Sequence, residues 1–155
     1  MSVADRLSGD IVDLAISSDL ERARDTALAI LKHHPDIELE QWRCVREAQY
    51  LEKSQEPREK RQEEIVNNLI PKLISVATKS AEFEFKVLLV SHGVFLEDLH
   101  NYLDQFAVKR KYFHLDPCRY KNTAVSNYVL NIDSDSINDV ICKYYACYKH
   151  VDKHE

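Results

Sequence analysis

Glycine is scarce in this sequence, with 2 residues among 155. Average usage would supply about 7% glycine, so the chain has few positions free to adopt left-handed backbone conformations. P-loop nucleotide enzymes and G-x-G-x-x-G dinucleotide-binding turns each need several glycines within one loop. Both classes are therefore excluded.

Long apolar runs and a basic excess are also missing. The longest aliphatic run covers residues 87–90, and the first seven residues, Met-Ser-Val-Ala-Asp-Arg-Leu, carry charge where a signal peptide needs an apolar stretch. We therefore expect a cytoplasmic protein without a membrane span. The 26 acidic residues outnumber the 21 basic ones, for a net charge of -5. General nucleic-acid binding needs a basic face, so it is excluded, and an anionic ligand would need local cations.

The four cysteines are not spaced as metal-binding pairs or as the dense framework of a small secreted protein. We interpret them as reduced thiols, and the sequence calls for no metal and no cofactor. A chain of 155 residues with 45% hydrophobic content is long enough to bury one core. We therefore expect residues 1–155 to form a single domain.

Two short apolar runs each lead directly into a helical pattern. Residues 11–17 read as a buried strand, and Ser18 with Glu21 then forms a capping-box pattern for a helix that ends before Pro35. Residues 86–90 predict a second buried strand, followed by leucines at helical spacing from residue 96 to residue 103. Strand followed directly by helix is typical of α/β proteins.

The remaining segments complete this pattern. The sequence predicts a strand within residues 37–45, an exposed loop over 50–61, and a helix from Pro57 with a kink or break before Pro71. Residues 122–132 and 140–148 predict a terminal hairpin. The fold class is therefore α/β, a mostly parallel sheet covered by helices with an antiparallel hairpin at its end.

Polar residues follow both predicted strand-to-helix switches, at the sheet edge where α/β proteins bind ligands. His92 and Gly93 follow the strand over 86–90, where helix N–H groups favour an anion. Arg22 lies one turn into the first helix, a position that disfavours a cation unless it shares an anion. The spacing leaves two alternatives open for His92, a ligand-binding group or a partly buried strand terminator. By spacing alone, Glu47 and Arg24 are surface residues.

Three motifs together resemble the histidine phosphatase superfamily, the phosphoglycerate-mutase-like proteins. They are Ser-Ser-Asp-Leu-Glu-Arg-Ala-Arg-Asp-Thr-Ala at residues 17–27, Val-Arg-Glu at 45–47 and Leu-Leu-Val-Ser-His-Gly at 88–93. A softer block, Asn-Thr-Ala-Val-Ser, follows at 122–126. The resemblance implies a three-layer phosphoglycerate-mutase-like sheet with helices on both faces. It also implies that Arg22, His92 and Gly93 bind phosphate, and that Glu47 and His92 serve catalysis in phosphomonoester hydrolysis through a phosphohistidine.

One motif of that superfamily is missing from this sequence. The nucleophilic histidine lies in an Arg-His-Gly motif at the end of the first strand, and no Arg-His-Gly occurs among the 155 residues. The resemblance therefore implies an amino-terminally truncated domain that lacks the first strand and associates through an incomplete sheet. It leaves open whether the chain is an enzyme. The alternative is a noncatalytic phosphate-binding or protein-interaction module, a pseudophosphatase.

Within that superfamily, the sequence most resembles the TIGAR-like fructose-2,6-bisphosphatases. The hints are residues 26–34, the Val-Ser-His-Gly strand at residues 90–93, and a cysteine in the last predicted strand, at residues 141–143. This resemblance implies a phosphorylated small molecule, a sugar phosphate, as the partner.

Overall fold

The computed structural model describes residues 2–47, 58–107 and 124–147. The helical elements are α1 (Val3–Leu7), α2 (Glu21–Leu31), η1 (Arg43–Val45, a 3-10 turn), α3 (Arg58–Glu64), η2 (Ile65–Leu69, a π-helical turn), α4 (Ile70–Lys79) and α5 (Gly93–Asp104). The strands are β1 (Leu14–Ser17), β2 (Leu39–Gln41), β3 (Val87–Val90), β4 (Val125–Asp133) and β5 (Ser136–Cys147). Strands and helices alternate up to α5, as the sequence predicts, and the fold is mixed α/β.

The parallel sheet has the order β2-β1-β3, with β1 paired to both neighbours. Ser17, the last residue of β1, lies opposite Gln41 on one side and Val90 on the other. All three strands therefore end at one edge of the sheet. The candidate site residues Arg22, Glu47 and His92 come after β1, β2 and β3 in the sequence. The fold therefore brings the backbone segments that carry them to this edge.

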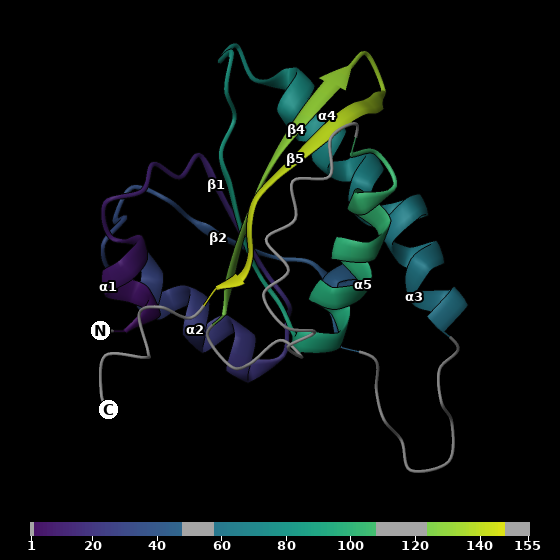
Figure 1. The fold of residues 1–155 in the computed structure, drawn as a ribbon. Coiled ribbons are helices and arrows are strands. Elements are labelled where there is room, and N and C mark those ends of the chain that lie inside the picture. Colours follow the sequence, from purple (N-terminus) through teal and green to yellow (C-terminus); the bar gives the residue numbers. More distant parts are fainter. Residues whose placement is uncertain (1, 48–57, 108–123, 148–155) are drawn as a thin grey trace, which may run out of the picture.

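Helices cover both faces of the sheet, so the molecule has three layers (Figure 1). Leu14, Ile16 and Leu89 pack into the main core with residues of α4 and α5. Leu88 and Val90 point the other way and pack against α1 and Ile30 of α2. This alternation follows from the strand geometry, in which successive side chains point to opposite faces. The predicted three-layer arrangement is confirmed.

The hairpin of β4 and β5 forms a separate two-stranded antiparallel sheet. It is joined by the two residues Ser134 and Asp135, and Ser134 adopts a φ of 53° there. The predicted terminal hairpin is confirmed over residues 125–147; residues 122, 123 and 148 lie outside the described part. Within the described residues, β3 pairs with β1 alone and β4 pairs with β5 alone. Association through this sheet remains a prediction.

Three local predictions need correction. The first strand begins at Leu14 rather than at Ile11, whose side chain is 67% exposed. Leu20 rather than Ser18 precedes the first helical residue of α2, and it makes no side-chain capping hydrogen bond. β3 is only partly buried, with Val87 38% exposed, because within the described residues it has a strand neighbour on one side only. Length and apolar content alone do not distinguish an edge strand from a central one.

The long helical region over residues 58–79 bends before Pro71 in the way the sequence predicts. The irregularity is a π-helical turn, Ile65–Leu69, and α4 then begins at Ile70 with the proline at its second position. A proline in the first turn has no intrahelical N–H bond to lose, and a π-turn absorbs the register change. Ile65 and Leu69 are fully buried. Residues 58–61 are helical, so the predicted loop is wrong there, and residues 48–57 lie outside the described part.

No helix in the described part of the chain is both long and apolar enough to span a membrane.

Candidate phosphate site

His92 lies at the carboxyl end of β3, directly before the first residue of α5. It is 5% exposed, and its side chain makes no capping hydrogen bond to the helix. Its ring instead spans two other elements. Nε2 lies 2.9 Å from Oγ of Ser18, and Nδ1 lies 3.2 Å from Nε of Arg22. The imidazole therefore joins the end of β3 to the start of α2.

The hydrogen-bond network assigns the tautomer of His92. Nε of Arg22 always carries its hydrogen, so Nδ1 of His92 must accept. A neutral imidazole then carries its hydrogen on Nε2, which donates to Ser18. The Ser18 hydroxyl also accepts from the backbone N–H of Leu20 at 3.2 Å. The serine that resembles a helix cap in the sequence therefore orients His92.

Arg22 is brought to the same place by α2, on which it is the second residue. The residue is exposed, so its guanidinium stays open to solvent while Nε reaches His92. Nη1 and Nη2 of an arginine bound through Nε can still contact an anion in the same plane. The structure therefore brings together Arg22 and His92, two of the residues that the sequence assigns to a phosphate pocket.

The segment that carries Glu47 is tied to this edge by Ser91. The Ser91 hydroxyl donates to the carbonyl oxygen of Val45 at 2.5 Å, and the backbone N–H of Trp42 donates to Ser17 at 2.9 Å. Glu47 is two residues beyond Val45, which limits the distance between their Cα atoms to about 7 Å. Its backbone therefore lies at the edge that carries His92. That its carboxylate converges on Arg22 and His92 remains a prediction.

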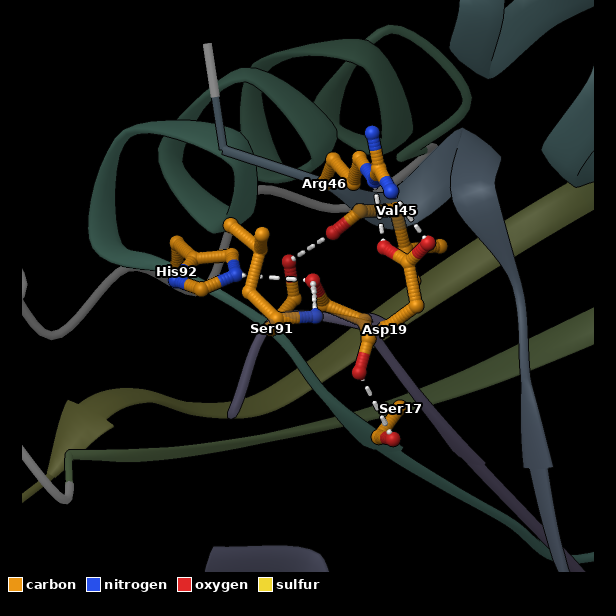
Figure 2. Close-up of polar contacts among 8 residues, drawn as sticks. Ser17, Asp19, Val45, Arg46, Ser91 and His92 are labelled. Carbon is orange, nitrogen blue, oxygen red and sulfur yellow. Dashed lines mark hydrogen bonds and ion pairs between the residues drawn. The ribbon is translucent and has the colours of Figure 1, made fainter. Parts of the chain in front are cut away.

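An ion pair that the sequence did not predict, between Arg46 and Asp19, lies beside His92 at this edge of the sheet (Figure 2). Nε and Nη2 of Arg46 donate to the two carboxylate oxygens of Asp19, a residue of the β1–α2 connection (Figure 2). Figure 2 also shows Ser91 and His92 beside this pair. Asp19 and Arg46 stand 27 positions apart on different elements, and no local pattern could have paired them. The only sequence signal is that Asp19 lies inside the motif at residues 17–27 and Arg46 inside the motif at residues 45–47.

Comparisons with known proteins show a partial sequence match and a similar fold. A sequence model described as the histidine phosphatase superfamily (branch 1) matches residues 1–69, which include Arg22 and Glu47. No curated protein sequence matches. A solved structure titled mycobacterial hydrolase 1 is 16% identical with a TM-score of 0.69, covering 94% of this chain and 81% of its own.

Two further solved structures are similar. A mycobacterial glucosyl-3-phosphoglycerate phosphatase, in complex with VO3, is 19% identical with a TM-score of 0.65 and covers 94% of this chain and 82% of its own. A phosphoglycerate mutase from Bacillus anthracis is 23% identical with a TM-score of 0.57 and covers 69% of this chain and 66% of its own. These similarities show that the chain has a phosphoglycerate-mutase-like fold. The sequence match ends before β3 and does not include His92.

Burial and a neighbouring positive charge favour the neutral form of His92. Burial, and then the positive charge of Arg22, lower the pKa of His92 below its ordinary 6.5, while the carboxylate of Asp19 opposes the shift. The neutral ring is what the hydrogen bond from Arg22 requires. A bound phosphate would add negative charge beside both groups and favour a protonated ring. Nδ1 of the protonated ring would then exchange its hydrogen bond from Arg22 for a donated hydrogen bond to a phosphate oxygen.

The depressed pKa of His92 predicts a pH-dependent stability. The unfolded chain takes up a proton on this residue at a higher pH than the folded chain, so the neutral ring contributes stability above about 6.5. That contribution is lost as pH falls below this value. Urea unfolding between pH 5 and pH 8 tests it, with His92→Gln as the comparison. The advantage of the wild type over the variant is expected to shrink toward low pH.

The variant comparison isolates His92 from His100, a half-buried histidine. Burial also lowers the pKa of His100, but that residue is present in both proteins and its effect cancels. A difference in unfolding free energy that stays constant from pH 5 to pH 8 would contradict the assignment of the neutral tautomer.

Other predicted surface residues are placed as follows. Arg24 is partly exposed and pairs with Asp25 at 3.2 Å, away from His92, as the sequence predicts. His33 is partly exposed at the end of α2. His34 is half-buried, and its Nε2 lies 3.1 Å from the carbonyl oxygen of Leu7, so it contacts α1. Neither histidine contributes to the site.

The described residues contain no group of three or more His, Cys, Asp or Glu side chains that could hold a metal ion. Cys44 and Cys142 are free, and burial raises the pKa of both thiols. Cys118 and the side chain of Cys147 lie outside what the structure describes.

Proposed function

We propose that this chain binds the phosphoryl group of a phosphorylated small molecule, a sugar phosphate, through Arg22 and His92. The observation that carries the proposal is the 3.2 Å contact between Nε of Arg22 and Nδ1 of His92 at the carboxyl edge of a parallel sheet. Two such groups supply charge-assisted hydrogen bonds to phosphate oxygens, and the N-terminus of α5 adds the positive end of a helix dipole beside them.

The proposed reaction is phosphomonoester hydrolysis through a phosphohistidine, as the resemblance to the superfamily implies. Arg22 and His92 would stabilise the charge that spreads over the phosphoryl oxygens in the transition state. Glu47 would protonate the leaving alcohol as the phosphoryl group passes to a histidine nitrogen, and would then take a proton from the attacking water. The narrower proposal is a fructose-2,6-bisphosphatase-like activity. The similarity of the fold to a glucosyl-3-phosphoglycerate phosphatase supports the wider class of phosphorylated small molecules.

A second candidate function is favoured by one property of the sequence. No Arg-His-Gly occurs among the 155 residues, and hydrolysis through a phosphohistidine requires a nucleophilic histidine that pocket cations do not replace. The second candidate is therefore noncatalytic binding of a phosphorylated ligand, a pseudophosphatase.

Measuring phosphate release and phosphate binding on the same purified chain distinguishes the hydrolase from the pseudophosphatase. The purified chain is incubated with fructose 2,6-bisphosphate, with glucosyl-3-phosphoglycerate and with p-nitrophenyl phosphate, and released phosphate and acid-labile phosphohistidine are measured. The hydrolase predicts both signals, and Glu47→Gln is expected to lower turnover without weakening phosphate binding. Binding of inorganic phosphate without turnover supports the pseudophosphatase. Failure to bind phosphate at all would contradict both.

A further inference from the structure

The ion pair between Arg46 and Asp19 joins two segments that each carry a part of the site. Both donors of Arg46 that face Asp19 are engaged, Nε with one carboxylate oxygen and Nη2 with the other. The side chains of Arg46 and Asp19 are 33% and 21% exposed, so solvent screens the pair only in part. A two-point contact of this kind fixes direction as well as distance.

Asp19 carries a negative charge next to the proposed phosphate site. It directly follows Ser18, whose hydroxyl holds His92, and its charge reaches the imidazole strongly enough to oppose the lowering of the His92 pKa. The pKa of Asp19 itself is lowered, chiefly by the hydrogen bonds from Arg46, so the carboxylate stays ionised. An ionised carboxylate in this place repels a phosphate unless another charge balances it.

Arg46 supplies the positive charge that balances Asp19. It also influences the position of Glu47 through the backbone. It directly precedes Glu47, and these two residues, which follow η1, are not in a helix or strand. Ser91 holds Val45 of the same segment. The residues before Glu47 are therefore attached at two successive positions, one to the end of β3 and one to the β1–α2 connection.

We propose that Arg46 is a positioning residue of the phosphate site, which neutralises Asp19 beside His92 and holds the segment that carries Glu47. Arg46 acts through Asp19 and does not itself contact the phosphate. The effect of Arg46 on phosphate binding rests on the proposed function. The effect of Arg46 on the His92 ring follows from the ion pair alone.

A double-mutant cycle with Arg46→Met and Asp19→Asn tests this role. Inorganic phosphate affinity is measured by calorimetry, and the pKa of His92 by NMR titration of its ring. Arg46→Met exposes the Asp19 charge, so phosphate affinity is expected to fall by about threefold to tenfold and the pKa of His92 to rise. In the double variant the unbalanced charge is gone, and affinity is expected to return to within about twofold of the wild type.

Arg24→Met is the matched control, because Arg24 also pairs with an aspartate, Asp25, but away from His92. It removes the same charge from the protein, and it is expected to leave the phosphate affinity and the pKa of His92 unchanged. Asp19→Asn alone is expected to lower the pKa of His92, the opposite direction to Arg46→Met. This single variant keeps the test decisive if Arg46→Met does not fold.

Three results would overturn the positioning role. The first is a double variant that binds phosphate as weakly as Arg46→Met, which would indicate a structural loss rather than an unbalanced charge. The second is a His92 pKa that does not move in opposite directions in the two single variants. The third is an equal loss in Arg24→Met. If the wild type binds no phosphate, the proposed function fails, and the His92 titrations alone still decide for or against the ion pair's action on the ring.

Discussion

Replacing His92 with alanine is expected to weaken inorganic phosphate binding by about tenfold to hundredfold. The loss corresponds to one charge-assisted hydrogen bond in a buried setting, about 1.5–3 kcal/mol. His92 is 5% exposed, so little solvent is present to replace the missing donor. The variant also removes the acceptor of Arg22 and the group that orients Ser18. Isothermal titration with phosphate at constant ionic strength measures the effect.

Arg22→Ala is expected to act in the same direction with a smaller effect, about threefold to tenfold. The Arg22 guanidinium is exposed, so water and salt screen its interaction with an anion. The smaller effect of Arg22→Ala should shrink further at high salt, whereas that of His92→Ala should persist.

His33→Ala and Arg24→Ala are the matched controls for these two variants. Each removes the same residue type from α2 or its carboxyl end, outside the site. Both are expected to bind phosphate as the wild type does. Unchanged phosphate affinity in folded Arg22→Ala and His92→Ala variants would contradict the site.

Replacing Phe95 with alanine is expected to lower the free energy of unfolding by about 3–5 kcal/mol. Phe95 is 1% exposed and belongs to the main core, together with Ile65 and Leu69 of η2. The substitution leaves a cavity in addition to losing buried apolar area. Since domains are stable by about 5–15 kcal/mol, this is a large part of the total. Urea unfolding followed by circular dichroism measures it.

Phe83→Ala is the control for this prediction, because Phe83 is fully exposed before β3. The same chemical change there is expected to alter stability by less than about 0.5 kcal/mol. Similar losses in the two variants would contradict the location of the core. Phe95 is the third residue after His92, so a folded Phe95→Ala protein also shows whether packing of α5 affects phosphate affinity.

The elements that sequence reasoning predicted correctly are those with a strong local signal. Apolar positions at helical spacing placed α2 and α5, and the burial of Ala23, Ala27, Ile30 and Leu31 agrees with that spacing. The proline at residue 71 placed the irregularity in the long helical region, because a proline lacks an N–H wherever it stands. β-branched and aromatic composition placed the hairpin.

The wrong predictions concern features that depend on a distant partner. Ser18 has the spacing of a helix cap, but its hydroxyl is held by His92, which is 74 positions away. β3 has the composition of a central strand, but it lies at an edge of the described sheet. In both cases a local pattern was assigned a local cause, and a residue from another element decided the outcome.

The order of strands and helices was determined by the sequence alone, and the resemblance of its motifs to a known family supplied the candidates Arg22, Glu47, His92 and Gly93. Secondary-structure propensity and the spacing of apolar residues depend on residues that are close together in the sequence, so they can be recognised without the tertiary structure. Only the tertiary structure decided that Arg22 and His92 meet and that Arg46 pairs with Asp19. Those contacts form because three parallel strands end at the same edge, and a hydrogen bond acts over about 3 Å however many residues separate its partners.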